Sequence, residues 1–184
     1  MTVIGIIALA AIFIFVVMYN SIIGKKNQIL NAQGGLDAQL KQRYDLIPNL
    51  VASVKKFMAH EQGVLEEIVR LRSQALGMRD LSEKQGIEAQ ISQKLGGLMV
   101  QVEQYPELKS SQNFLNLQEN IYRVEENIAA SRRFFNAAVV DFNNALEMFP
   151  SNLVGKMMGL KSRQVFEIPE IQRKNVDVAK MLDS

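Results

Sequence analysis

Apolar residues recur along most of the chain at alternating spacings of three and four positions, which is the spacing of one face of an α-helix. One row runs through residues 36–75, a shorter row through 87–102 and a third through 114–149. Rows sustained over several heptads are typical of coiled coils and helical bundles. The pattern therefore predicts an all-α fold in which long helices pack as an antiparallel bundle.

Helix-breaking sequences separate the three rows. Residues 77–86 begin and end with glycine and divide the first predicted helix from the second. Tyr105-Pro106 is expected to end the second helix, because the residue before a proline avoids the helical region. The third helix is predicted to start at Ser110 or Ser111 as its N-cap and to end at Phe149-Pro150.

Pro48 lies inside the longest row, where it has no N–H to donate to the carbonyl of Tyr44. Two local structures fit this position. A helix restarts here with Asp45 as its N-cap and Pro48 in the first turn, or one long helix continues and kinks at Pro48.

Two charged residues, Arg43 and Glu61, occupy positions in the apolar row of the first helix. An unpaired charge buried there would be costly. Either both residues lie at the edge of the row and reach solvent, or they pair across the bundle. Glu125 and Arg132 of the third helix are the candidate partners, and we favour paired structural groups.

Residues 2–24 carry no charge and are followed by Lys25 and Lys26. About 20 apolar residues in a helix are enough to cross a bilayer. A cleaved signal is disfavoured, because no basic residue precedes the run, the run is long and no small-residue cleavage site follows. We therefore expect a single-pass anchor in the cell (inner) membrane. The positive-inside rule places the N-terminus outside and the bulk of the chain in the cytoplasm.

These observations divide the 184 residues into three parts. Residues 1–24 form the transmembrane anchor, 25–166 the helical bundle, and 167–184 a weakly patterned tail that is disordered or a partner segment. The net charge of +2 gives no reason to expect nucleic acid. The anchor and the tail indicate other partners, namely the lipid bilayer, further copies of the chain and a membrane protein.

Catalytic and metal-binding patterns are sparse. There is no cysteine, and His60 is the one histidine, in a sequence without the second histidine of a zinc helix. No phosphate-binding loop, dinucleotide fingerprint or nucleophile elbow occurs. The sequence therefore predicts a protein that is not an enzyme and that has no cofactor, no metal site and no catalytic residue.

The predicted helices differ greatly in length, so the short second helix cannot cover the apolar rows of the other two. An apolar surface left over in this way is a candidate contact for another copy of the chain. Aromatic residues of the third row are the candidate oligomer contacts, namely Phe135, Phe142 and Phe149.

Several short sequences resemble the LemA family and stand in the family's order. They are LKQRYDLIPNLV at 40–51, His60-Glu61, YPELK at 105–109, ASRRFFN at 130–136 and FPSN at 149–152. The similarity covers roughly residues 19–167. The candidate structural and family-motif residues are Arg43, Asp45, Pro48, Asn49, His60, Glu61, Pro106, Glu125, Arg132, Asn136 and Pro150.

The resemblance implies a bacterial, membrane-anchored helical bundle without an established enzymatic activity. A magnetosome-membrane protein of the same group suggests membrane organisation, and family members encoded near membrane proteases suggest envelope quality control. Two hypotheses follow. One is a scaffold that self-assembles through its long helices and organises the membrane or envelope complexes. The alternative is an adaptor or regulator of a membrane protease or signalling partner, acting through the apolar, basic segment 153–161 and the tail.

Overall fold

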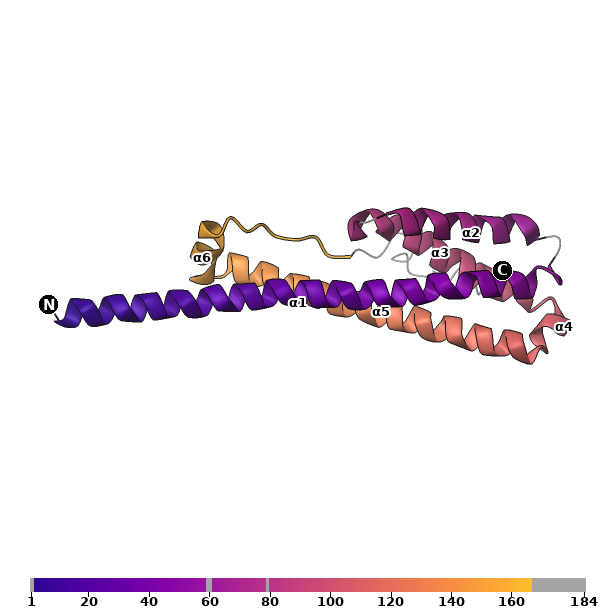
Figure 1. Ribbon diagram of the computed structural model, residues 1–184, viewed down its shortest axis with the longest axis horizontal. Coiled ribbons are helices and arrows are strands. Elements are labelled where there is room, and N and C mark those ends of the chain that lie inside the picture. Colours follow the sequence, from indigo (N-terminus) through magenta and orange to yellow (C-terminus); the bar gives the residue numbers. More distant parts are fainter. Residues whose placement is uncertain (1, 59–60, 79, 167–184) are drawn as a thin grey trace, which may run out of the picture. The chain divides into compact units, whose positions relative to one another are not determined.

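The computed structural model describes residues 2–58, 61–78 and 80–166, and these are all-α (Figure 1). Within those ranges no strand occurs. The helices are α1 (Thr2–Val54), α2 (Gln62–Gly77), α3 (Leu81–Val102), α4 (Pro106–Lys109), α5 (Gln112–Glu147) and α6 (Ser151–Met157). The predicted fold class is confirmed. The predicted tail at 167–184 lies outside the described residues.

Contacts group the chain into two units. Unit 1 combines α1 up to Arg43 with Tyr122–Val165, and unit 2 comprises Tyr44–Ile121 together with Phe166. Helices α1 and α5 each contribute to both units, because each continues past the boundary. Neither boundary lies at a loop, so no sequence signal marks it.

The first part of α1 is a candidate membrane span. Among the described residues, α1 is the one helix that is long and apolar enough to cross a membrane, with a mean hydropathy of 2.7 over its most apolar window. None of that window is buried within the chain, which distinguishes it from a core helix. Its large apolar side chains are exposed, as at Ile7 and Phe13. These properties indicate a single-pass membrane protein.

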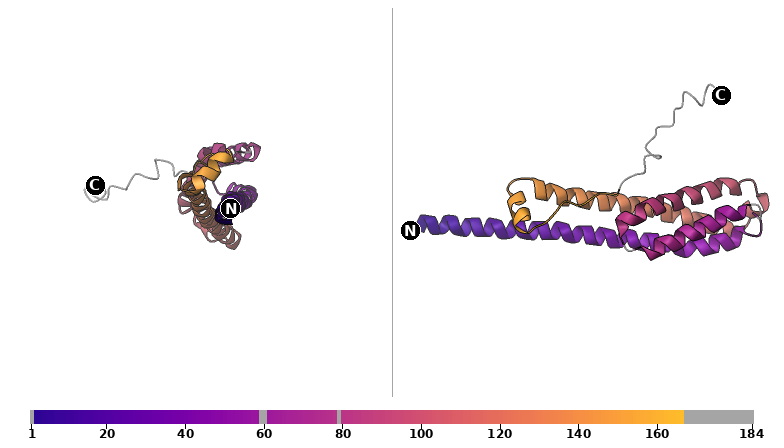
Figure 2. Two further views of the ribbon diagram at one scale, coloured as in Figure 1. Left: turned by 90° about the vertical axis from the view of Figure 1, so that its left-hand side faces the viewer. Right: turned by 90° about the horizontal axis from the view of Figure 1, so that it is seen from above.

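Unit 1 buries one row of α1 and one row of α5. The α1 row begins at Ile22 and continues through Ile29, Leu36 and Leu40. The α5 row has the predicted spacing of three and four, and its buried members in unit 1 are Val124, Ile128, Phe135, Ala138, Phe142 and Ala145. Figures 1 and 2 both show this part of α5 running beside α1. The short helix α6 follows α5 and buries Val154 and Gly155.

Unit 2 contains α2 packed against α3, together with the end of α1 and the start of α5. Their buried side chains include Leu50, Ile68, Leu71, Ile91 and Leu98. Each lies on a face with helical spacing, as amphipathic packing requires.

The row at residues 36–75 was assigned to the first predicted helix, with Pro48 as its one point of interruption, and this prediction is wrong, because the break lies after Val54. The chain leaves α1 after Val54, whose carbonyl accepts the N–H groups of Phe57 and Met58, and α2 begins at Gln62. Met58 is fully buried although it lies in the turn, so the apolar spacing continues across the break. Neither Pro nor Gly occurs between 55 and 61 to announce the turn.

Of the two alternatives for Pro48, the continuing helix is confirmed, and the restart with Asp45 as its N-cap is wrong. Of the other predicted boundaries, the break at 77–86 is shorter than expected, because α3 already begins at Leu81. The third predicted helix is confirmed as α5, which starts directly after Ser111 and ends before Phe149-Pro150. The peptide bond between Phe149 and Pro150 is cis.

Candidate functional site

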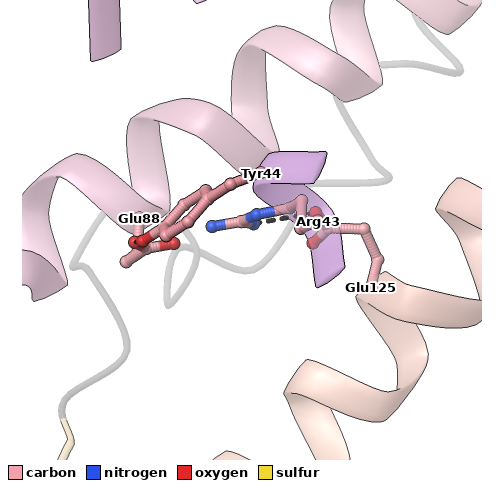
Figure 3. A network of polar contacts seen from close by, with 4 residues as sticks. All are labelled: Arg43, Tyr44, Glu88 and Glu125. Atoms are coloured by element: carbon pink, nitrogen blue, oxygen red, sulfur yellow. Dashed lines mark hydrogen bonds and ion pairs between the residues drawn. The ribbon is translucent and has the colours of Figure 1, made fainter. Parts of the chain in front are cut away.

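The first polar contact of the core is an ion pair between Arg43 of α1 and Glu125 of α5, both in unit 1. The Arg43 Nη1 atom lies 2.8 Å from Glu125 Oε1, and the exposed fractions of the side chains are 1% and 27% (Figure 3). Burial of a guanidinium requires an opposite charge, because desolvation is not otherwise offset. The predicted pairing of Arg43 with Glu125 is confirmed.

The second contact joins Tyr44 of α1 to Glu88 of α3, both in unit 2. The Tyr44 hydroxyl donates a hydrogen bond to Glu88 Oε1, and Figure 3 shows the ring directed towards that carboxyl group. Both residues are buried, and Glu88 is one of two buried charged residues in the described ranges. A buried carboxylate is tolerated only with hydrogen-bond donors, so this contact fixes how α3 lies against α1 within unit 2.

The third contact compensates for Pro48. A helical residue at position 48 would donate its N–H to the Tyr44 carbonyl, but proline has none. Arg72 of α2 donates from Nε to that same carbonyl oxygen at 2.7 Å. A side chain of the neighbouring helix thus replaces the missing helical hydrogen bond, which explains how α1 continues through the proline.

Most other predicted site residues lie apart from these contacts. Asp45 and Asn49 are exposed on α1, and the Asn49 carbonyl accepts a hydrogen bond from Ser53 Oγ at 2.8 Å. Glu61 is not on a helical seam as predicted, but precedes the first residue of α2. A carboxylate at this end of a helix is favoured by the helix dipole. His60 lies outside the described residues.

The remaining predicted residues fall at helix ends or on α5. Pro106 is the first residue of α4, and Pro150 precedes α6. Arg132 and Asn136 are partly buried on α5. The three candidate oligomer contacts differ in environment, because Phe135 and Phe142 are buried within unit 1 and Phe149 is 80% exposed.

Sequence reasoning missed Glu88 and Arg72, and assigned Tyr44 no contact. The buried row of α3 contains Glu88, three positions before Ile91, and not Ile87 as predicted from the sequence. The spacing of three residues was the signal that could have identified Glu88. For Arg72 the sequence gives only half of the contact: it shows that the Tyr44 carbonyl receives no N–H from Pro48. Which arginine supplies the new donor depends on the turn after α1, and the sequence did not reveal that turn.

No group of three or more His, Asp or Glu side chains in the described ranges is placed to hold a metal ion. The exposed pair on α2 is an ordinary surface ion pair, in which the hydrogen bond from Arg70 holds the pKa of Glu67 below its usual value. The buried polar groups instead join helices, so the arrangement is structural.

Comparison with known proteins identifies the family. The model of the LemA family matches residues 32–179, which is most of the chain. The chain belongs to the LemA family. The protein named LemA from Metamycoplasma hominis is 29% identical over 92% of this chain and 78% of its own length. All three core contacts lie within the matched region.

Two further relatives are named magnetosome proteins. MamQ from Magnetospirillum gryphiswaldense is 30% identical over 44% of this chain, and MamQ 2 from Paramagnetospirillum magneticum is 29% identical over 45%. These matches cover only 30% of the MamQ chains. The similarity to the M. hominis LemA protein extends over far more of both chains.

Proposed function

We propose that this LemA-family chain is a non-enzymatic scaffold of the inner membrane, which self-assembles through its long helices and organises the membrane or envelope complexes. The observation that carries the proposal is α1, a single helix from the apolar segment at Thr2 into the buried core at Val54. A continuous helix transmits the position of the membrane anchor directly to the bundle. The buried pairs of Arg43 and Tyr44 then hold other helices against it.

The side of the membrane follows from charge. Lys25, Lys26 and Lys41 lie within about 20 residues of the apolar segment, and basic residues near a span favour the cytoplasmic side. The bundle therefore faces the cytoplasm in this proposal. The relatives named magnetosome proteins support a role at membranes.

Self-assembly needs exposed apolar side chains, and α5 has several. In unit 1, Tyr122, Phe134 and Val140 are 55%, 54% and 46% exposed. Exposed apolar side chains of this size are candidate contacts between copies. Phe134 replaces Phe135 and Phe142 as the best probe, because a charge at either buried position would unfold the chain.

The test is the native mass of the full chain in lipid nanodiscs. The scaffold predicts a defined assembly larger than the 20.7 kDa chain. Phe134→Glu should lower the assembly size while the helix content by circular dichroism persists. Arg133→Glu is the matched control, because it changes the charge of an adjacent exposed residue without removing an aromatic ring. A monomeric wild-type chain would contradict self-assembly.

A groove in unit 2 favours the adaptor as a second candidate function. Its volume is about 410 Å³, and it is formed by the end of α1, the turn and α2. Val51, Met58, Leu65 and Val69 line it, with Lys55, Glu66 and Arg70 among the polar lining residues. A photoactivatable cross-linker on Val69→Cys would discriminate. Cross-links to another membrane protein from a monomeric chain favour the adaptor, and cross-links between copies favour the scaffold.

A further inference from the structure

One end of unit 1 lies beside the point where α1 leaves the apolar segment. Ile22 is the first fully buried residue of α1, and α6 and the chain after it lie alongside this part of the helix in Figures 1 and 2. A pocket of about 340 Å³ opens here, lined by Lys26 of α1, Phe142 of α5 and residues 159–163. We call it the basic pocket, because it includes Lys26, Lys161 and Arg163.

Two features fix the position of residues 159–163, which line the basic pocket. The Asn143 side chain donates to the Arg163 carbonyl and accepts from the Arg163 N–H, both at 2.9 Å. These paired bonds fix the segment after α6 against α5. Gly159, with φ of 64°, reverses the chain at the end of α6 in a conformation that favours glycine. The pocket is therefore a defined part of the fold.

Charge at this end of unit 1 is strongly one-sided. Residues 2–36 and 148–166 contain five basic side chains and no Asp or Glu, the basic residues being Lys25, Lys26, Lys156, Lys161 and Arg163. The nearby acidic residues of α5 are Asp141 and Glu147, and both are exposed. Among the described residues, the side chains of Lys26, Lys161 and Arg163 form no ion pair. The charges of the basic pocket are therefore available to an anion.

Exposed apolar side chains accompany these charges. The corner between α5 and α6 presents four of them, with exposed fractions of 64%, 80%, 53% and 76% at Met148, Phe149, Leu153 and Met157. Large apolar side chains beside lysine and arginine are typical of segments that lie in a membrane interface. Lys26 follows the uncharged segment by two residues, so a bilayer around that segment would have its headgroups near the basic pocket.

We propose that residues 148–163 dock on the bilayer surface and that the basic pocket binds the phosphate of an anionic phospholipid. The four apolar side chains enter the boundary between headgroups and acyl chains. Lys26 and Lys161 supply point charges to the phosphate, and Arg163 can donate two parallel hydrogen bonds. This site goes beyond the scaffold function, since it requires no contact between copies.

The absence of tryptophan from the sequence provides the experiment. Phe149→Trp places one fluorophore at the exposed corner, and the full chain is reconstituted in liposomes whose lipids carry bromine near the headgroup. The bromine quenches a tryptophan that lies in the interface. Phe134→Trp is the control, measured in chain diluted to one copy per liposome so that no contact between copies covers it; its side chain is 54% exposed and lies about 20 Å away along α5. We expect strong quenching at position 149 and little at position 134.

Lipid composition then tests the basic pocket. Quenching should be greater with phosphatidylglycerol than with phosphatidylcholine. Each basic side chain contributes about fivefold, or about 1 kcal/mol, to binding at an anionic surface. Lys161→Gln with Arg163→Gln should therefore weaken this binding by about 25-fold and move half-maximal quenching to a higher phosphatidylglycerol fraction. Lys84→Gln with Lys94→Gln, two changes on α3 of unit 2, is the control and should leave it unchanged.

Three results would overturn the proposal. The first is equal quenching at positions 149 and 134. The second is quenching at position 149 that is the same with phosphatidylglycerol and phosphatidylcholine and is unchanged by Lys161→Gln with Arg163→Gln. The third is loss of the phosphatidylglycerol effect in millimolar inorganic phosphate at matched ionic strength, which would assign the pocket to free phosphate. A monomeric chain that still shows the expected quenching would contradict the scaffold and leave lipid docking supported.

Discussion

Replacing Arg72 tests how α1 accommodates Pro48. The Arg72→Ala change removes the hydrogen bond from Nε to the Tyr44 carbonyl, whose length is 2.7 Å. Hydrogen bonds from charged donors contribute about 1.5–3 kcal/mol. Because Arg72 is only partly buried, we expect the free energy of unfolding to fall by about 1.5 kcal/mol, the lower end of that range.

The second perturbation, Pro48→Ala, restores an N–H that can donate to the same carbonyl. Proline within a helix costs about 3 kcal/mol relative to alanine, so this variant should be more stable than the wild type by part of that amount. In the Pro48→Ala background the acceptor no longer depends on α2. There Arg72→Ala should cost only about 0.5 kcal/mol, which reflects the lost packing of its aliphatic stem.

The assay is urea unfolding of the full chain in detergent micelles, followed by circular dichroism at 222 nm. A change in midpoint at constant slope reports a change in stability. Arg70→Ala on the same helix is the matched control, because its side chain bonds only to Glu67 on the surface in the described structure. If Arg72→Ala costs the same with proline and with alanine at position 48, the two residues are independent and the reasoning fails.

Three further predictions concern other contacts. A double-mutant cycle of Arg43→Met and Glu125→Gln should give a coupling of about 2 kcal/mol, between the values for exposed and buried ion pairs, and a coupling near zero would contradict the pairing. Phe142→Ala should lower the free energy of unfolding by about 3–5 kcal/mol, because the ring is fully buried, and a loss below about 1 kcal/mol would contradict that burial. The Glu67 carboxyl group should titrate in NMR with a pKa below its usual value, because Arg70 donates a hydrogen bond to it. Its pairing with Arg70 is then complete above the usual pKa and is lost as the pH falls through the lowered pKa. Arg70→Gln should raise the pKa of Glu67, and an unchanged pKa would contradict the pairing.

The helical faces could be predicted because a helix of 3.6 residues per turn that buries one face places apolar residues at spacings of three and four. Val124, Ile128 and Phe142 are buried as their positions in the third row indicate. Arg43 could be matched to Glu125 for a related reason. A charge in an apolar row requires an opposite charge, and few acidic residues border the facing row.

Other features depend on tertiary structure that local patterns do not record. Buried Met58 follows buried Val54 at helical spacing although it lies beyond the end of α1. The apolar pattern therefore does not show that α1 ends at Val54. Glu88 resembles a surface residue until its partner Tyr44 is known. The exposure of Phe149 likewise depends on where α5 ends, because the side chain lies just beyond the last helical residue.

The central claim is that α1 carries the membrane anchor into the bundle as one uninterrupted helix, and a spin-label distance tests it most directly. The chain has no cysteine, so labels can be placed at Ser21→Cys and Gln42→Cys, two exposed positions that flank Gly34 and Gly35. The labelled chain is diluted with unlabelled chain in nanodiscs, so that distances between copies do not contribute. A continuous helix predicts a narrow distribution near 31 Å, at 1.5 Å per residue. A broad or much shorter distribution would show that α1 bends or breaks at the glycine pair, which would contradict the account.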